Sequence, residues 1–414
     1  MASERAIDCP THLAVDEARR RIVELCAPRR LSAEDVPLDR ALGRVLAADV
    51  VAQQAIPPFA NSAMDGYALR GEDLPRDGER RFRVNGVLLA GGRDQLYVDQ
   101  GECVRITTGA PLPAGADTVV MKERVRVEGD KIVVGAGETS GSNVRPAGED
   151  YAIGDVALSE GERITAARLG VLASCGRDPV SAYRQPRIAL FVTGDELVPP
   201  GTPLGRGQIH DSNRYSLGAL LRQSGIEPER SVHIRDDPAA LRDALRDASE
   251  TCDVVISSGG VSAGEADHFP RVVAELGKVH FWKVRMKPGM PFLCGEVGRA
   301  MVFALPGNPV SSFATFLMLV RPGLAMLQGA READRSWRAR LAEPIRKKHD
   351  RTEFLRARLQ ICGDGSLEVA ALDRQGSGML RGVAEADCLI VVPEAARELA
   401  RGDVVDVVYL PGLC

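Results

Sequence analysis

The sequence predicts a multidomain protein of the α/β plus β class, with a central α/β domain, helical and β domains before it and a β domain after it. Between about residues 181 and 328, strand-like apolar runs alternate with helix patterns, which is typical of βαβ units with right-handed connections. Short β runs separated by Gly, Pro and Asp fill residues 82–134, and β patterns return after Trp337. A chain of 414 residues is long enough for roughly two to four domains.

Two helices are predicted near the N-terminus, because apolar residues recur at helical spacing over residues 15–25 and again over 38–46. A third is predicted to begin after Thr165, a good N-cap, and to end at Gly176, a good residue for the position after a helix. The β runs lie between these helices, which indicates an insertion. The predicted domains are a helical scaffold (1–55 and 145–180), an inserted β domain (56–144), the α/β domain (181–328) and a C-terminal β domain (329–414).

The α/β domain is predicted to contain five strands: Ile188–Val192, Val232–Ile234, Val254–Ser257, Val279–Val284 and Met301–Leu305. In an open parallel sheet, the loops that follow the strands gather at the carboxyl edge, where ligands bind. Here those loops carry glycines, six carboxylates and two lysines. That combination suits a polyanion held together with a hard cation such as Mg²⁺.

Composition excludes several classes of partner. The net charge of -4 and an aromatic content of 4% argue against nucleic acid, because phosphate binding needs clustered Lys and Arg and base stacking needs aromatic rings. Nine widely spaced cysteines without a Cys-x-x-Cys pair indicate a reducing compartment and no zinc site. The polar N-terminus is unlike a signal peptide, and Pro306–Pro309 divides the uncharged run from Ala300 to Val320 into a strand and a helix. A cytoplasmic protein without a membrane span is therefore expected.

Each loop of the α/β domain also has a simpler explanation. Ser258–Asp267 is glycine-rich and suits a phosphate, but it is neither a Walker A loop nor a dinucleotide fingerprint, and a flexible connection explains it equally well. Asp195 and Glu196 are adjacent carboxylates, and a bound Mg²⁺ ion would relieve the repulsion between their negative charges. A turn or a helix cap is the alternative explanation. Asp237 precedes a proline, which favours a helix N-cap, whereas Asp236 stays open.

Taken one at a time, the remaining candidate residues also have an ordinary structural explanation beside the functional one. Lys283 and Lys287 lie at a strand exit, where lysines suit an oxyanion and a solvated pair is the ordinary alternative. Pro306–Pro309 precedes an apolar helix, so it is either a rigid turn or a source of backbone N–H groups for an anion. Asp65 and Thr108 lie in turn-like strings of the inserted domain, and turn chemistry is their simplest explanation.

Seven strings occur together and in a fixed order: Ser62–Ala68, Thr108–Pro111, Val144–Asp150, Thr193–Leu197, Ser257–Asp267, Lys287–Pro291 and Leu305–Ser311. With them, the chain resembles the molybdopterin molybdenumtransferases, the MoeA family that includes the E domain of gephyrin, over nearly its whole length. The resemblance implies an elongated, four-part subunit. Its parts are a helical scaffold, an inserted β domain, a doubly wound α/β domain that binds molybdopterin and a C-terminal β-barrel-like domain.

The resemblance also implies a reaction, in which molybdate is inserted into adenylylated molybdopterin and AMP is released with the help of Mg²⁺. The implied enzyme is a homodimer, and its site lies in a cleft between the α/β domain of one subunit and the N-terminal domains of the other. Molybdopterin adenylyltransferase and the proteins that mature molybdoenzymes are the further partners that such a role suggests.

Carried onto matching positions, the resemblance implies these catalytic residues: Asp65, Thr108, Asp150, Glu196, Asp236, Asp267, Lys283 and Lys287. Of these, Glu196 and Asp267 would ligate the metal ion. The implied substrate-binding residues are Gly194, Ser258, Gly259, Gly260, Ser262, Gly264, Pro306, Gly307 and Asn308. Met290 stands where many bacterial family members carry a second lysine, so we expect it to pack rather than to contact an anion.

Three other functions compete with this one. Residues 181–328 alone also resemble the enzyme that adenylylates molybdopterin with ATP, but the N-terminal strings and the C-terminal β domain favour the metal-inserting enzyme. A scaffold or receptor anchor, as in gephyrin, is disfavoured because no fused domain or long linker is present. A nucleotide-binding module without turnover is disfavoured by the carboxylates at Asp65, Glu196 and Asp267.

Overall fold

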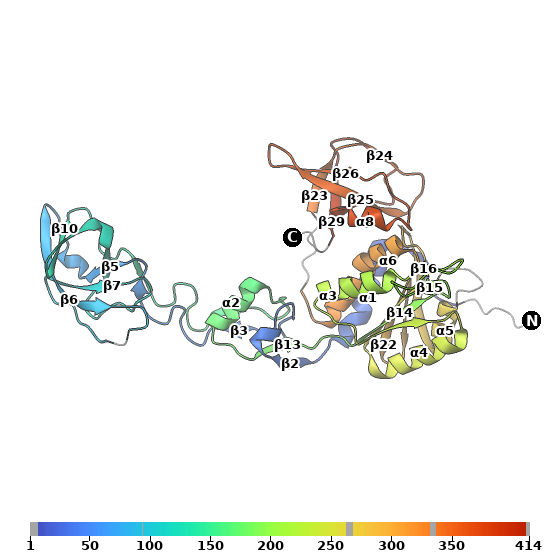
Figure 1. The fold of residues 1–414 in the computed structure, drawn as a ribbon, viewed down its shortest axis with the longest axis horizontal. Helices are drawn as coiled ribbons and strands as arrows, with labels where there is room; N and C mark the ends of the chain where they lie inside the picture. Colours follow the sequence, from blue (N-terminus) through green and yellow to red (C-terminus); the bar gives the residue numbers. More distant parts are fainter. Residues whose placement is uncertain (1–6, 93, 262–267, 332–336, 411–414) are drawn as a thin grey trace, which may run out of the picture.

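The computed structural model describes residues 7–92, 94–261, 268–331 and 337–410. In Figure 1 the inserted β domain lies at one end of an elongated molecule, the α/β and C-terminal domains lie at the other end, and the scaffold lies between them. The predicted fold class is confirmed, because a central α/β domain is combined with N-terminal domains and a closed C-terminal β-barrel.

A mixed sheet forms the centre of the α/β domain. Its seven strands are β1 (Thr11–Leu13), β14 (Ile188–Thr193), β17 (Arg230–Ile234), β18 (Val254–Ser258), β19 (Gly277–Val284), β21 (Leu293–Val297) and β22 (Ala300–Leu305). Their order is β1-β19-β21-β22-β18-β14-β17, and β22, β18, β14 and β17 are parallel. The five strands predicted from apolar runs are all confirmed, whereas β1 and the antiparallel β21 are not among them.

Helices cover both faces of this sheet, which makes the domain doubly wound. They are α1 (Val15–Cys26), α3 (Asn213–Gln223), α4 (Pro238–Thr251), α5 (Phe269–Leu276), α6 (Pro309–Thr315) and α7 (Arg321–Leu327), with a π-helical turn at Phe316–Val320 that joins α6 to α7. Because side chains alternate along a strand, Leu190 packs into the core with α1, α3 and α7, whereas Phe191 packs into the core with α4 and α5. Burial of one such side chain stabilises the fold by about 1.5–3 kcal/mol.

The first helix corrects one predicted domain assignment. α1 forms as its periodicity predicts, but its buried residues Val15, Ala18 and Ile22 belong to the core of the α/β domain rather than to the scaffold. The preceding strand, β1, pairs in parallel with β19 at the edge of the central sheet. The periodicity of a helix shows which face is buried but not which domain buries it, so the prediction that residues 1–55 belong to the scaffold does not hold for β1 and α1.

The second predicted N-terminal helix is wrong. Only Leu38–Arg40 forms a short 3₁₀ turn, and Val45 and Leu46 make β-bridges to Arg163 and Ala182. The physical reason is Gly43, whose φ of +78° cannot continue a right-handed helix. The third predicted helix is confirmed, because Thr165 caps it and Gly176 follows it with a φ of +67°.

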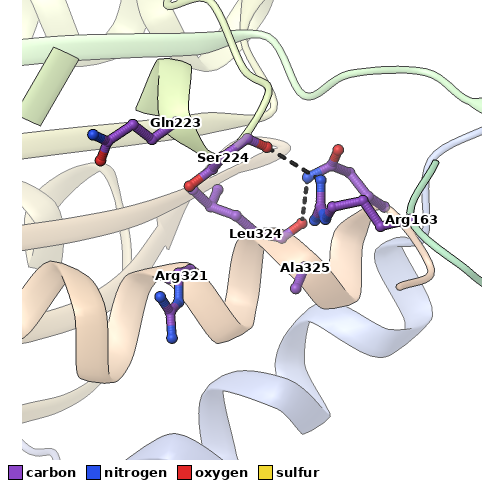
Figure 2. Close-up of a pocket in the computed structure, with 7 residues that line it drawn as sticks. Arg163, Gln223, Ser224, Arg321, Leu324 and Ala325 are labelled. Atoms are coloured by element: carbon purple, nitrogen blue, oxygen red, sulfur yellow. Dashed lines mark hydrogen bonds between the residues drawn. The ribbon is translucent and has the colours of Figure 1, made fainter. Parts of the chain in front are cut away.

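The scaffold is built from short pairs around one helix: β2 (Ala33–Val36) with β13 (Val180–Tyr183), β3 (Val50–Val51) with β12 (Val156–Leu158), and α2 (Ala166–Ser174). Arg163 joins it to the α/β domain, since its Nη1 donates to the carbonyl oxygens of Gly43 at 2.7 Å and of Ser224 at 3.2 Å. Figure 2 shows this guanidinium beside the carboxyl end of α3, where a positive charge is favourable. The residues drawn there line a small cavity at the junction between the scaffold and the α/β domain.

The inserted domain is a six-stranded sheet in the order β8-β5-β7-β6-β10-β9. Its strands are β5 (Gly66–Leu69), β6 (Glu79–Leu88), β7 (Glu102–Ile106), β8 (Thr118–Met121), β9 (Val125–Glu128) and β10 (Lys131–Gly135). Two small cores lie on its two faces, around Phe82 on one and Val104 on the other. The pair β4 (Asn61–Ser62) and β11 (Val144–Arg145) links it to the scaffold.

The C-terminal domain is a five-stranded barrel that β25 and β27 close. Its strands are β23 (Trp337–Leu341), β25 (Thr352–Ile361), β26 (Leu367–Ala371), β27 (Cys388–Val392) and β29 (Val404–Tyr409), with the outer pair β24 (Ile345–Arg346) and β28 (Glu398–Leu399) and the helix α8 (Leu380–Ala384). A strand of the preceding domain, β20 (Met286–Lys287), adds to the start of β25 and places Lys287 opposite Glu353. This register joins the barrel to the α/β domain.

One helical segment, Pro309–Leu327, is long and apolar enough to cross a membrane by length and composition. It is nevertheless an interior helix, because 78% of its apolar window is buried within the protein. The predicted division of the uncharged run is confirmed, since β22 ends at Leu305 and the helix begins at Pro309.

Candidate functional site

A cleft of about 450 Å³ lies at the carboxyl edge of the central sheet. That volume falls within the range of roughly 300–1,000 Å³ that is typical of small-molecule sites. The cleft is lined from the loops after β14, β17, β18 and β22, as the parallel arrangement predicts. Its lining includes these predicted residues: Gly194, Glu196, Asp236, Ser258, Gly259, Gly260, Pro306, Gly307 and Asn308.

Glycine is required where two of these loops cross. Gly259 has a φ of +99°, and a Cβ atom added there would lie 2.6 Å from the carbonyl oxygen of Thr193. Its neighbour Gly260 also has a positive φ, of +66°. Since side chains are excluded here by both conformation and space, the backbone itself forms the wall of the cleft.

The hydroxyl group of Ser258 lies inside the protein rather than toward a ligand. It accepts a hydrogen bond from Asn213 Nδ2 at 2.8 Å, donates to the carbonyl oxygen of Pro306 at 3.1 Å and lies 3.0 Å from Ser312 Oγ. Asn213 Nδ2 also donates to the carbonyl oxygen of Gly307 at 2.7 Å. The side chain of Ser258 therefore fixes the loops to one another, and only its backbone is left to face a bound molecule.

The acidic residues at the cleft and next to it have different roles. Asp195 and Asp236 bind each other's loops, because the backbone N–H of each donates to the carboxylate of the other, at 3.4 and 3.3 Å. Glu196 is exposed at the mouth of the cleft. Asp237 accepts a hydrogen bond from Ala239 N at 3.0 Å and caps α4, so the predicted N-cap is confirmed.

Three predicted site residues, Ser262, Gly264 and Asp267, lie outside the described residues. Of the two metal ligands that the resemblance implies, Glu196 and Asp267, only Glu196 is among the described residues. Within residues 7–261 and 268–410, apart from the gaps at 93 and 332–336, no three His, Cys, Asp or Glu side chains gather around a common point. Glu196 and Asp236 nevertheless line one cleft, and Mg²⁺ usually binds one or two carboxylates together with substrate phosphates, so the donors present fit such an ion.

Lys283 lies beside the glycine-rich loop rather than within it. Its backbone has an unusual φ of +66°, and its Nζ lies 4.4 Å from the centre of the Trp282 ring. The indole N–H of Trp282 donates to the carbonyl oxygen of Val261 at 3.0 Å. A cation–π contact thus holds the ammonium group next to the ring that supports the glycine-rich loop.

Lys287 makes an ion pair that the sequence does not predict. Its Nζ lies 2.8 Å from Oε1 of Glu353, at the first residues of the barrel, and Oε2 of Glu353 lies 3.3 Å from Nε2 of His349. The Glu353 side chain is 9% exposed, whereas that of Lys287 is 46% exposed. A buried carboxylate of the barrel therefore holds a partly exposed lysine of the α/β domain.

Met290 is half-buried, and its Sδ lies 3.7 Å from Nη1 of Arg351. This contact agrees with the expectation that Met290 packs.

Asp65 and Thr108 meet in the inserted domain, with Lys122 as a third member that the sequence does not single out. Oδ1 of Asp65 accepts hydrogen bonds from the backbone N–H of Thr108 at 2.9 Å and from its hydroxyl at 3.0 Å, and Lys122 Nζ lies 3.4 Å from Oδ2. The two bonds from Thr108, and then the bond from Lys122, lower the pKa of Asp65 below its usual value. The carboxylate accordingly stays ionised at neutral pH.

Replacing Thr108 by Val is expected to raise the pKa of Asp65 toward its ordinary value, because the hydroxyl donor is lost while the backbone donor remains. A lowered carboxylate pKa stabilises the fold above the pKa of unfolded Asp, about 3.9, and this contribution disappears as the pH falls through the native value. A ¹³C NMR titration of the carboxyl group measures the change. Thr107→Val is the matched control, because the Thr107 hydroxyl accepts a hydrogen bond from Ala90 N and does not contact Asp65. An equal pKa shift of Asp65 in both variants would contradict the role given to the Thr108 hydroxyl.

The chain does not bring all predicted residues together. Asp150 is exposed on the connection between the scaffold and the inserted domain, where its backbone N–H donates to Ile56 O at 2.9 Å. Asp65 directly precedes β5 and Thr108 follows the end of β7, and these strands lie at the opposite end of the molecule from the α/β domain (Figure 1). Within one chain the candidates are therefore separated: nine of the predicted residues line the cleft, Lys283 and Lys287 are not among its lining residues, and Asp65, Thr108 and Asp150 belong to the N-terminal domains.

Three family models match the chain in sequence. The MoeA N-terminal region (domain I and II) matches residues 13–176, a probable molybdopterin binding domain matches residues 189–326, and the MoeA C-terminal region (domain IV) matches residues 338–410.

Individual relatives agree over the whole length. The molybdopterin molybdenumtransferase of Haemophilus influenzae is 36% identical over 398 residues, which cover 95% of this chain and 98% of the relative. That of a Nostoc species is 35% identical and covers 91% and 89%. A crystal structure of a molybdopterin biosynthesis MoeA protein from Pyrococcus horikoshii superimposes with a TM-score of 0.80 at 29% identity and covers 97% and 100%. The chain therefore belongs to the MoeA family, the molybdopterin molybdenumtransferases of molybdenum cofactor biosynthesis.

Proposed function

We propose that this chain inserts molybdate into adenylylated molybdopterin and releases AMP, in the cytoplasm and with the help of Mg²⁺. The observation that carries the proposal is the cleft at the carboxyl edge of the sheet, where glycine backbone, Glu196 and Asp236 line one space. A pyrophosphate group needs backbone N–H donors and a divalent cation, and the cleft offers oxygen ligands for the cation together with backbone that a phosphate can approach closely.

Three sets of residues would contribute to this reaction. The loops at Gly259 and Gly307 approach each other closely and leave room for the phosphates. Lys283, beside Trp282, and Lys287, beside Glu353 of the barrel, are not among the lining residues of the cleft, and they would attract molybdate and offset the negative charge that develops as AMP leaves. Mg²⁺, held by Glu196, Asp236 and Asp267, would polarise the pyrophosphate when it is bound.

We further propose that the working enzyme is a homodimer. Asp65 and Thr108 lie next to β5 and β7, at the other end of the molecule from the α/β domain, and Asp150 lies on the connection to them, so they would serve the reaction only where a second copy brings its N-terminal domains to the cleft. The ionised carboxylate of Asp65 and the hydroxyl of Thr108 would then form the facing wall. Molybdopterin adenylyltransferase would supply the substrate, and proteins that mature molybdoenzymes would accept the product.

The test is to give the purified protein adenylylated molybdopterin, Mg²⁺ and graded molybdate, and to follow AMP release and cofactor formation. AMP release that depends on both molybdate and Mg²⁺ supports the proposal, and a parallel titration with tungstate ranks the two oxyanions. Tight binding without AMP release would favour a binding role, and ATP consumption with free molybdopterin would favour the adenylylating reaction. Mixing Asp65→Asn and Glu196→Gln subunits tests the dimer, because a shared cleft restores activity in mixed pairs.

A further inference from the structure

Two side-chain oxygen atoms of residues that line the cleft lack hydrogen-bond partners among the described residues. Thr193 and Asn213 are only 8% and 9% exposed, and both line the cleft. Among the residues that the structure describes, Thr193 Oγ1 and Asn213 Oδ1 have no hydrogen-bond partner. A buried polar atom without a partner is rare in folded proteins and destabilises them, so each such atom calls for a reason.

The surroundings of Asn213 determine which amide atom is unpartnered. The carbonyl oxygen of Gly307 can only accept, and it lies 2.7 Å from the amide nitrogen of Asn213. The NH₂ group must therefore face Gly307 and Ser258, which leaves Oδ1 as an acceptor. Ser258 is itself held by Ser312, so the orientation of the amide is fixed by a buried network.

Thr193 lies directly beneath the two glycines of the loop after β18. An added Cβ atom would lie 2.7 Å from Thr193 Oγ1 at Gly259 and 3.1 Å from it at Gly260. Any side chain at these positions would collide with the hydroxyl group. Only glycine therefore lets this loop lie directly against the buried, unpartnered hydroxyl of Thr193.

We propose that Thr193 Oγ1 and Asn213 Oδ1 hydrogen-bond the organic part of the substrate, an inference that rests on the proposed function and extends it. Oδ1 of Asn213 only accepts, so it pairs with an N–H or O–H group, as a fused nitrogen heterocycle or a sugar offers. The oxygens of molybdate carry no hydrogen at neutral pH and cannot fill this position. The anionic groups of the substrate accordingly lie toward the lysines and the loop N–H groups. Its part with N–H or O–H donors lies against Thr193 and Asn213.

The first test is Thr193→Val, which removes the hydroxyl and keeps the shape of the side chain. Removal of an unpartnered buried hydroxyl should leave the melting temperature unchanged or raise it, while affinity for adenylylated molybdopterin falls about tenfold, as the loss of one hydrogen bond predicts. Anaerobic calorimetric titration measures the affinity. The matched control is Ser257→Ala, because Ser257 Oγ is also buried and unpartnered in the described part of the chain but does not line the cleft.

The second test separates the amide oxygen of Asn213 from the network that it holds. Asn213→Ala removes Oδ1 and its network bonds, whereas Ser312→Ala loosens the same network and leaves Oδ1 in place. Only Asn213→Ala should weaken binding of adenylylated molybdopterin by about tenfold or more, and neither variant should change the affinity for molybdate alone, which lacks a donor.

The outcomes separate this inference from the proposed function. If the wild-type chain binds adenylylated molybdopterin and Thr193→Val binds it equally well, the inference is overturned and the proposed function stands. The same holds if Ser257→Ala or Ser312→Ala weakens binding as much as its partner variant, because the effect is then structural. If the wild-type chain binds neither adenylylated molybdopterin nor molybdate, the proposed function fails and the inference fails with it.

Discussion

Replacement of Lys287 by Gln is expected to lower kcat/KM for molybdate-dependent AMP release by about a hundredfold, the usual effect of removing one donor that stabilises a developing anion. The ammonium group is partly exposed beside the barrel and is held by Glu353, at a distance of 2.8 Å. Lys has three N–H donors, so two remain for an oxyanion after the bond to Glu353 is made. Steady-state AMP release under graded molybdate measures the change.

Glu353 should act on the reaction only through Lys287. A long, partly exposed lysine loses conformational freedom when an anion binds it, and a buried carboxylate that already holds it reduces that loss. Glu353→Gln is therefore expected to lower kcat/KM in the wild-type chain and to have no further effect in a Lys287→Gln background. The fold is expected to lose little, since an ion pair with one exposed partner contributes at most about 1 kcal/mol.

Glu394→Gln is the matched control for this cycle. It breaks the ion pair between Arg285 and Glu394, which lie 3.0 Å apart across the same boundary between the α/β domain and the barrel. If domain docking alone mattered, Glu394→Gln would reduce turnover as much as Glu353→Gln does. Equal losses in these two variants, or additive losses in the Lys287→Gln background, would contradict a positioning role for Glu353.

The local parts of this fold could be predicted from the sequence because their signals are local. β14 is an uninterrupted apolar run that ends at Thr193, which is typical of a strand buried on both faces. Asp237 before a proline predicts a helix cap, and the structure has one. The carboxyl edge of the sheet follows from the parallel order of such strands, so the position of the cleft was predictable as well.

The contacts across domains could not be predicted, because no local pattern encodes them. α1 has a clear apolar face, but only the folded chain shows that this face covers the central sheet. Glu353 lies 66 positions after Lys287, and its place opposite that lysine depends on the pairing of β20 with β25. Lys122 and Asn213 carry no signal in the sequence beyond being polar residues at the ends of elements, where ordinary surface roles are far more common.

Replacement of Gly259 by Ala is expected to destabilise the α/β domain by roughly 3 kcal/mol, the sum of a left-handed backbone strain of about 1–2 kcal/mol and an overpacking term of similar size. The strain arises because φ is +99°, and the overpacking arises because the new Cβ would lie 2.6 Å from the backbone oxygen of Thr193, which cannot rotate away. The new methyl group should also collide with Thr193 Oγ1, displace the loop and abolish binding in the cleft. Urea unfolding followed by Trp282 fluorescence in a Trp337→Phe background reports on this domain, since these are the 2 tryptophans of the chain.

Gly307→Ala is the control for stability, because Gly307 lies close to Gly259 in the lining of the same cleft. A Cβ atom added at Gly307 would meet only Gly259 Cα, at 3.6 Å, which is an ordinary contact distance, and its backbone does not have a positive φ. Its unfolding free energy is expected to change by less than about 1 kcal/mol, since Ala also restricts the unfolded chain. If Gly259→Ala unfolds at the same urea concentration as Gly307→Ala, the loop after β18 can move away from β14, and the close approach of these two strand ends is not what shapes the cleft.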